Sequence, residues 1–311
     1  MNRDELARVL ELRSRNYTER LDDKWEKVLE SHKWSSFYEP LRYATKDGKR
    51  IRPLILMLAG ESVGIPENKT DYFKRLLFQL KNEYEFLNPE DFISVIRGNL
   101  NITDTHRLLT FDDGFYSNYS FAKEVLGPLG IKAIFFIPTG FIDSNSKDIH
   151  KEFIRQNLYE GQYPSNFDTD EMKPMTWENL SELVNMGHTI GAHTKNHLRL
   201  SEINEDNLLK EEIIASGDRI EEMLRIKVEH FAFPFGDIGS IDKKALELAR
   251  TRYKYIYSGV RGRNSYGTNP FAIRREALDI GDSYEYNRFV AGGGLSFYYW
   301  RARQRLDAMV K

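Results

Sequence analysis

Residues 133–137 read Ala-Ile-Phe-Phe-Ile, apolar at every position, so a strand formed here must have both faces buried. Parallel strands covered by helices show this pattern, whereas a half-exposed antiparallel strand alternates apolar and polar residues. Apolar runs alternate with amphipathic stretches over residues 70–283, which predicts an α/β fold, either an α/β barrel or a doubly wound sheet. Strands are expected at 107–111, 132–137, 188–192, 229–233 and 254–257, and helices at 71–82, 90–98, 118–127, 176–186, 203–225 and 241–251.

Two segments flank this α/β region. Residues 1–35 carry apolar positions at helical spacing among many charges, and residues 51–63 form a second expected helix before glycine and proline interrupt the pattern. We therefore expect an amino-terminal helical extension over residues 1–69. Residues 284–311 are expected to form a carboxyl-terminal helical tail, broken near its start by the glycines at 292–294.

The composition limits the function. The chain has 311 residues, 45 basic and 47 acidic side chains and a net charge of −2, so it lacks the basic excess of a nucleic-acid-binding protein. Cysteine is absent, which leaves histidine and carboxylates as ligands for any transition metal.

No apolar run approaches the roughly 20 residues that a transmembrane helix needs. The longest runs are 54–59 and 133–138, and residues 1–20 lack the apolar core of a signal peptide. We expect a protein without a transmembrane segment that acts in the cytoplasm.

The first candidate for chemistry is an aspartate pair. Residues 109–114 read Leu-Thr-Phe-Asp-Asp-Gly, at the end of an expected strand. On extended backbone Asp112 and Asp113 point in different directions, so one could bind a metal while the other handles a proton. The alternative is a turn, because Asp-Gly favours turns and an aspartate here could cap the helix that begins near Ser117.

The second candidate is a histidine pair that also follows an expected parallel strand. The spacing of His193 and His197 places both imidazoles on one face if the backbone turns helically, and Thr194 can hold such a turn by hydrogen bonding. Two solvated loop histidines are the alternative. With one carboxylate, the pair would make a metal site with open positions for water and substrate, as in a metal-assisted hydrolase.

Both motifs resemble those of a known family. Thr-Phe-Asp-Asp-Gly at 110–114 and His-Thr-Lys-Asn-His at 193–197 look like the first two motifs of the polysaccharide deacetylases, the NodB-type carbohydrate esterases. Residues 121–141 and 175–194 are similar to the segments that follow the aspartate motif and lead into the histidine motif. Phe-Ala-Phe-Pro-Phe-Gly at 231–236 resembles a variant of the third motif.

This resemblance, over about residues 70–283, implies a deformed (β/α)7 TIM-like barrel of the glycoside hydrolase/deacetylase type. It implies a divalent metal, commonly zinc, although the ligand types also suit cobalt, nickel or iron. The family's metal ligands map onto Asp113, His193 and His197, and its general base onto Asp112. The implied reaction is hydrolysis of an N-acyl, usually N-acetyl, group on a sugar.

The third motif of the family supplies a backbone N–H to the oxyanion, which maps onto Phe235 after Pro234. Two features of the family are missing. Ala232 stands where well-known members have an arginine that orients the base, and no histidine follows His230 to protonate the leaving amine.

Arg274 and Arg275 are candidates to replace the missing arginine, with a surface basic pair as the alternative. Arginine stays protonated and cannot act as the acid.

A second, short resemblance lies at residues 41–65, which look like the opening of trans-type polyprenyl diphosphate synthases. Lys49 and Arg50 match a diphosphate-binding stretch, but the aspartate-rich motifs for prenyl transfer are absent, so that activity is rejected. A solvated basic turn is one interpretation. The other is contact with the diphosphate of a lipid-linked or nucleotide-linked sugar.

The residues and the resemblance together predict a metal-dependent sugar N-deacetylase that acts on a glycan or a lipid- or nucleotide-linked glycan precursor. Two alternatives stay open: a non-catalytic carbohydrate-binding relative, and a deformylase or cyclic-amide hydrolase of the same superfamily.

Overall fold

The computed structural model describes residues 69–102, 105–161, 172–279 and 282–311. The described residues within 68–279 and 289–311 belong to one compact unit, and so do all features discussed below except most of α14 (Tyr284–Ala291). The expected helices at 1–35 and 51–63 lie outside the described residues. None of the described helices is long and apolar enough to cross a bilayer.

The described strands form two parallel sheets. Strands β1 and β2 make a two-stranded sheet, and β3 to β7 make a five-stranded sheet in chain order. The strands are β1 (Glu85–Phe86), β2 (His106–Arg107), β3 (Leu109–Phe111), β4 (Ala133–Ile137), β5 (Thr189–Ala192), β6 (His230–Ala232) and β7 (Tyr255–Tyr257).

The strand order decides between the two architectures that the sequence left open. In a doubly wound sheet the order reverses at a switch point, whereas the larger sheet here runs β3-β4-β5-β6-β7 without reversal. The stretch 269–275 continues the sheet beyond β7, because Ile273 forms a parallel bridge with Tyr257. The result is the curled, barrel-like parallel sheet that was expected, with all carboxyl ends of its strands at one edge.

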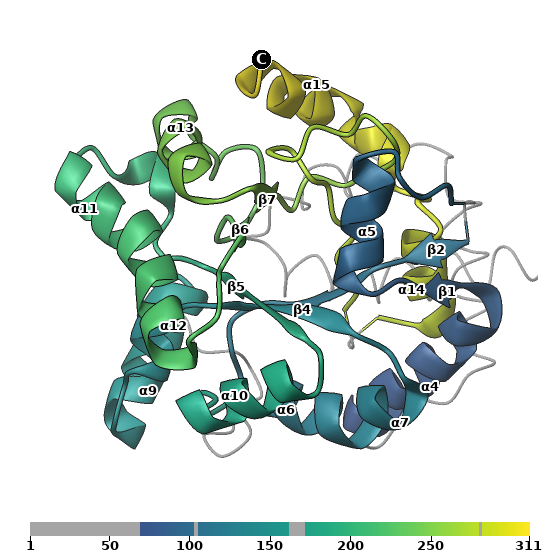
Figure 1. The fold of residues 1–311 in the computed structure, drawn as a ribbon, viewed down its shortest axis with the longest axis horizontal. Helices are drawn as coiled ribbons and strands as arrows, with labels where there is room; N and C mark the ends of the chain where they lie inside the picture. Colours follow the sequence, from purple (N-terminus) through teal and green to yellow (C-terminus); the bar gives the residue numbers. More distant parts are fainter. Residues whose placement is uncertain (1–68, 103–104, 162–171, 280–281) are drawn as a thin grey trace, which may run out of the picture. The chain divides into compact units, whose positions relative to one another are not determined.

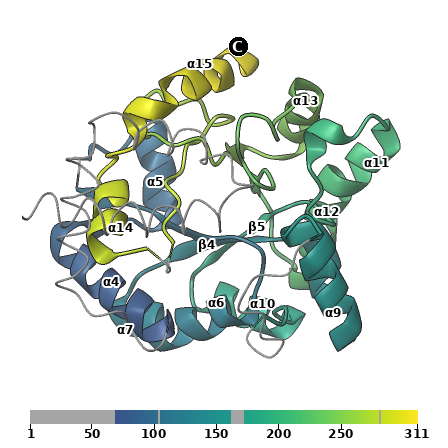
Figure 2. The same ribbon diagram turned by 180° about the vertical axis from the view of Figure 1, so that it is seen from behind.

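Helices of the same compact unit surround this sheet in both views (Figures 1 and 2). The α-helices are α4 (Lys69–Glu83), α5 (Pro89–Ile96), α6 (Tyr116–Phe121), α7 (Gly127–Leu129), α8 (Thr139–Ile142), α9 (Lys147–Phe153), α10 (Trp177–Asn185), α11 (Asp206–Lys210), α12 (Ser216–Leu224), α13 (Lys243–Arg252), α14 (Tyr284–Ala291) and α15 (Trp300–Met309). Wider π-type turns are η1 (Ala122–Leu126), η2 (Ile154–Leu158) and η4 (Glu211–Ala215), and 3₁₀ turns are η3 (Leu200–Glu202) and η5 (Ser296–Tyr299).

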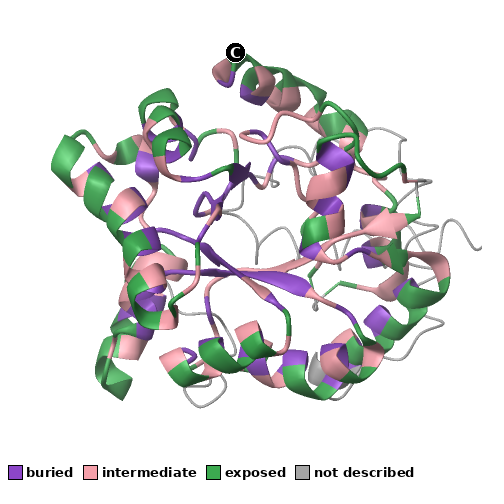
Figure 3. Ribbon diagram, in the orientation of Figure 1, coloured by how far each residue is buried: buried purple, intermediate pink, exposed green. Residues whose placement is uncertain are grey.

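Strand β4 shows why a run that is apolar on both sides belongs at the centre of the sheet. Its alternate residues enter two separate clusters, because side chains along a strand alternate between faces. Phe135 packs in the cluster under the surrounding helices, and Phe136 packs in the cluster that α5 and β7 complete. Figure 3 shows the strands largely buried and the exposed residues on the helices.

The expected helices and strands of residues 70–283 are present, with small shifts at their ends. The expected strand at 107–111 is divided at Leu108, because β2 pairs with β1 whereas β3 pairs with β4. Helices α8 and α9 were not expected from the sequence. They are short, and α9 buries only Phe153, so neither carries a long apolar stripe.

Candidate metal centre

The aspartate and histidine motifs meet at the carboxyl edge of the sheet. Asp112 and Asp113 directly follow β3, and His193 directly follows β5. Strands β3 and β5 both pair with β4, so their ends lie two strands apart on the same edge. Parallel α/β folds bind ligands at this edge, because loops from separate strands converge there.

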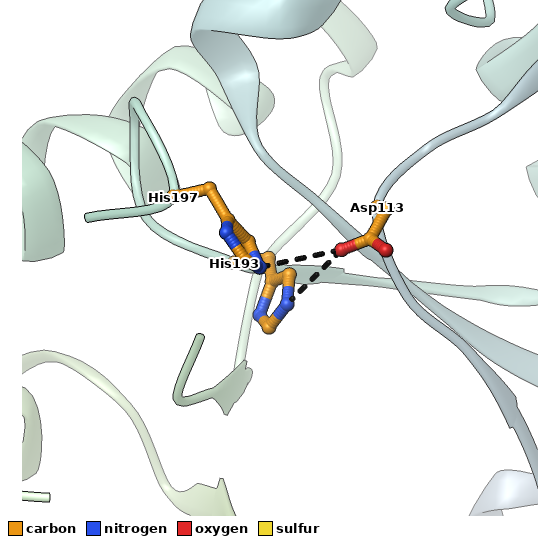
Figure 4. Close-up of side chains that lie close together, drawn as sticks. All are labelled: Asp113, His193 and His197. Atoms are coloured by element: carbon orange, nitrogen blue, oxygen red, sulfur yellow. Dashed lines mark ion pairs between the residues drawn. The ribbon is translucent and has the colours of Figure 1, made fainter. Parts of the chain in front are cut away.

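Three side chains converge on one point (Figure 4). Asp113 Oδ1 lies 3.3 Å from His197 Nε2 and 3.6 Å from His193 Nε2, and the three ligand atoms lie within 4.8 Å of one another. Two ligands at about 2.1 Å from a tetrahedral zinc ion would be about 3.4 Å apart. The spacing therefore fits a first-row divalent metal with these three ligands.

The hydrogen bonds of the two histidines fix the tautomer that can bind a metal through Nε2. His193 Nδ1 is 2.8 Å from the carbonyl oxygen of Ala232, and His197 Nδ1 is 2.8 Å from that of Asn157. Each Nδ1–H donates to its carbonyl, which leaves the Nε2 lone pair facing Asp113. Burial lowers the pKa of His193 to about 3, so the ring is neutral. The contact of His193 with Asp113 is therefore not an ion pair between opposite charges. Instead, the lone pair of His193 Nε2 and the carboxylate of Asp113 are placed to bind a metal cation together.

The backbone at the aspartate pair differs from the extended conformation expected for it. Asp113 has a φ of 72° and Gly114 one of 70°, both left-handed. This turn swings Asp113 back toward the side on which Asp112 lies, and Asp112 Oδ2 is 3.8 Å from His193 Nε2. The expectation that the two carboxylates point in different directions was wrong, because the strand ends at Phe111 and the chain turns at Asp113.

The histidine loop is also not helical. Thr194 and His197 have φ values of 64° and 55°, which non-glycine residues seldom adopt. Thr194 holds the loop as its chemistry suggested, because its Oγ1 accepts a hydrogen bond from the His197 N–H at 2.9 Å. Each such conformation costs on the order of 1–3 kcal/mol, so surrounding contacts must maintain it.

One of those contacts is a buried carboxylate that was not singled out from the sequence. Glu212, in η4, is fully buried and accepts hydrogen bonds from the N–H and the side-chain amide of Asn196, both at 2.8 Å. Burial raises the pKa of Glu212 despite these bonds. A signal was available: Glu212 lies beside Leu209 and Ile213 on the apolar face of its helix, where a charged residue needs a partner.

Asp112 is held by Arg275. The guanidinium donates from Nη1 to Oδ1 at 2.6 Å and from Nη2 to Oδ2 at 2.9 Å, while its Nε donates to the carbonyl of Ser258 at 3.0 Å. Burial raises the pKa of Asp112, but the charge and the hydrogen bonds of Arg275 outweigh burial and bring the pKa below its usual range. Asp112 is therefore an ionised, oriented carboxylate, which a proton acceptor requires.

The two candidate arginines have different partners. Arg275 reaches the site because its segment runs beside β7, where the Ile273 N–H donates to Ile256 at 3.0 Å. Arg274 turns away and pairs with Asp307 of α15 at 2.7 Å. A guanidinium thus faces Asp112 although Ala232 replaces the family's usual arginine.

Pro234 and Phe235 lie at the end of β6. Phe235 has a φ of 61°, and its ring packs against His197 with a centroid distance of 4.8 Å. Its N–H has no hydrogen-bond partner within the described part of the chain, so it is available to a ligand. His230 lies earlier in β6, where its Nδ1 is 2.9 Å from the Tyr257 hydroxyl in the interior.

Tyr159 was not expected at the site. Burial raises its pKa, and the nearby charges of Asp113 and Asp279 raise it further, so the phenol stays protonated at neutral pH. Tyr159 directly follows η2, whose Asn157 carbonyl accepts a hydrogen bond from His197, and this short segment lacks a sequence motif. Lys49 and Arg50, the candidate diphosphate contacts, lie outside the described residues.

The comparisons with known proteins agree with this geometry. Residues 101–255 match the model of the polysaccharide deacetylase family. A protein of Bacillus subtilis (strain 168), named "Putative polysaccharide deacetylase YxkH", is 23% identical over 225 residues, which are 72% of this chain and 69% of that protein.

Solved structures share the fold. IcaB from Ammonifex degensii superposes with a TM-score of 0.55 at 21% identity, covering 71% of this chain and 89% of that one. The deacetylase PplD of Streptococcus pyogenes, solved in complex with acetate, gives a TM-score of 0.54 at 20% identity, covering 72% and 86%. Residues 101–255 of this chain belong to the polysaccharide deacetylase family.

Proposed function

We propose that this chain is a metal-dependent hydrolase that removes an N-acyl group, in the first place N-acetyl, from a sugar of a glycan or glycan precursor. The observation that carries the proposal is the pairing of two features at one edge of the sheet. A group of two histidines and Asp113 suits a divalent metal, and beside it Arg275 holds Asp112 ionised.

Asp113, His193 and His197 would hold the metal. Zinc is our first choice, and cobalt, nickel or iron suit the same ligands. When bound, the cation would supply Lewis acidity toward water and toward the acyl carbonyl.

The residues of the chain supply the remaining steps. Asp112 accepts the proton of the attacking water, and Arg275 keeps the carboxylate ionised and aimed. The N–H of Phe235 donates to the oxyanion of the tetrahedral intermediate. Asp112 then carries a proton, which it can return to the leaving amine, so the absence of a histidine after His230 does not prevent turnover.

Acetate release from N-acetylated sugars and oligosaccharides tests the proposal, with metal content measured in parallel. Wild type should release acetate, and Asp112→Asn should lose activity by about 10²–10⁴-fold while retaining the metal. His193→Ala is the complementary variant and should lose the metal as well. Full activity of Asp112→Asn would remove the assigned base.

A carbohydrate-binding relative without activity is the second candidate, favoured by the lack of the family's histidine acid. It predicts bound metal and bound glycan with no release of any acid. A deformylase would instead release formate from N-formylated sugars, and a cyclic-amide hydrolase would open the ring of a cyclic amide. Assays with these two substrate types, added to the acetate assay, therefore separate the three functions.

A further inference from the structure

The carboxyl-terminal segment exposes large aromatic side chains that the proposed reaction does not use. Phe297 is 79% exposed and Tyr298 71% exposed, in the 3₁₀ turn η5, and Trp300 at the start of α15 is 44% exposed. Isolated exposed aromatics are common, but three within four residues form an apolar patch of the kind that marks an interaction site. We call these three residues the aromatic tip.

The tip is presented on a fixed support. Leu306 of α15 and Val310, which directly follows the helix, are buried in the main core, and Asp307 pairs with Arg274. Arg303 donates to the carbonyl of Ser296, the first residue of the turn that carries Phe297 and Tyr298. The aromatic rings are therefore held outward by contacts on the other side of the segment.

The exposed charged side chains of the segment that carries the tip have a single sign. Arg301, Arg305 and Lys311 are exposed on the same segment, and Arg301 lies over the Trp300 ring at 5.5 Å. The one acidic residue of 289–311 is Asp307, which Arg274 neutralises. The carboxyl-terminal segment thus combines exposed aromatic rings with an excess of positive charge.

We propose that the aromatic tip, with Arg301 and Arg305, binds the surface of an anionic lipid membrane. Tyr and Trp rings are favoured at the headgroup level because they have an apolar body and a polar edge. Arginine beside them would meet lipid phosphates. α15 has 10 residues, so the segment would lie in the interface and not span the bilayer.

Charge favours this partner over a second copy of the chain. Two copies that met through their tips would bring like charges together, whereas an anionic membrane neutralises Arg301 and Arg305. The inference does not depend on the deacetylase proposal, because it uses no residue of the metal centre.

Co-sedimentation of the full chain with lipid vesicles tests the inference. The probes are vesicles of phosphatidylcholine alone and of phosphatidylcholine mixed with phosphatidylglycerol. Wild type should bind the mixed vesicles, bind the neutral ones much less, and release as salt rises. Phe297→Ser/Tyr298→Ser should abolish binding, and Tyr266→Ser, which alters a 77% exposed tyrosine elsewhere, should not.

A second pair of variants tests the charges. Arg301→Gln/Arg305→Gln should lower the partition coefficient roughly fivefold per arginine removed. Lys74→Gln/Arg75→Gln removes the same charge from exposed positions of α4 and should change binding little.

Two results would overturn the inference. One is equal binding of wild type and the Phe297→Ser/Tyr298→Ser variant to mixed vesicles. The other is no binding by wild type together with a concentration-dependent dimer, seen by sedimentation equilibrium, that the same variant abolishes. Acetate release from a soluble substrate is measured on all variants, so that loss of membrane binding and loss of the metal centre are distinguished.

Discussion

Of two adjacent arginines, Arg275 contacts Asp112 and Arg274 does not. The fold, and not the residue type, decides between them. Neighbours in an extended segment point to opposite sides, so only one of two adjacent arginines can face Asp112. Their sequence, Arg-Arg after Ile273, does not say which, because the answer depends on how residues 269–275 pair with β7. The residue types of the metal centre were recognisable in the sequence, but this partner of the base was only one of two candidates.

Arg275→Gln should lower kcat by about 10²–10³-fold, because Asp112 loses the charged donors that orient it. KM and metal content should change little, since Arg275 does not contact the three ligands. Arg275→Lys keeps the charge but not the two-pronged geometry and should recover part of the loss. Steady-state kinetics of acetate release measure these effects.

Arg274→Gln is the matched control, since it removes the neighbouring guanidinium and the ion pair with Asp307. Its kcat should remain within a few fold of wild type. If Arg274→Gln loses as much activity as Arg275→Gln, the loss in both variants comes from damage to the segment 269–275 and not from the loss of the contact between Arg275 and Asp112.

Elements that bury a long apolar stripe or face were foreseeable from the sequence, and short elements were not. Strand β4 is apolar on both faces and helix α10 begins with a Thr176 capping box, so both carry local signals. The helical stretch α9–η2 has neither a long stripe nor a motif, yet it brings Asn157 to His197. One support of the metal ligands, the carbonyl of Asn157, therefore comes from a segment that sequence periodicity does not reveal.

Glu212 of η4 supports the loop that carries His193 and His197, and this support can be tested. Glu212→Gln should weaken metal affinity by about 10–100-fold, because the loop between His193 and His197 is strained and Asn196 loses its charged acceptor. A competition titration with a chromogenic zinc chelator measures the affinity, and circular dichroism checks the fold.

Glu211→Gln is the control for this helix. Glu211 is the adjacent carboxylate, it is exposed, and it pairs with Lys195 at 2.5 Å. A surface pair contributes little, so metal affinity should be near that of wild type. Should Glu212→Gln lower the stability of the fold yet bind zinc as wild type does, Glu212 is a core residue without a role in positioning the ligands.

For the molecule as a whole, the sequence did not determine the order of the strands in the larger sheet. Alternating strands and helices fit both a barrel and a doubly wound sheet, because local patterns do not record which strands pair. The curled sheet also buries polar side chains that do not belong to the metal centre. His188 and His230 are examples, 4% and 8% exposed.

These two buried histidines make the folded state sensitive to acid. Burial lowers the pKa of each to about 4, whereas an unfolded histidine has a pKa of about 6.5. As pH falls below about 6.5 the unfolded chain takes up protons that the folded chain refuses until about pH 4. Stability is therefore lost across this window, by up to about 3 kcal/mol for each histidine.

Urea unfolding of the chelator-treated protein at several pH values between 7 and 4.5 measures this loss, since a bound metal would add its own pH dependence. His188→Gln should be less stable than wild type at pH 7, because the ring packs on Phe135 and accepts the Ala133 N–H at 3.1 Å. Its free energy of unfolding should nevertheless fall less steeply with acid, since glutamine does not titrate. An equally steep fall in both proteins would show that His188 is not one of the groups that take up protons on unfolding.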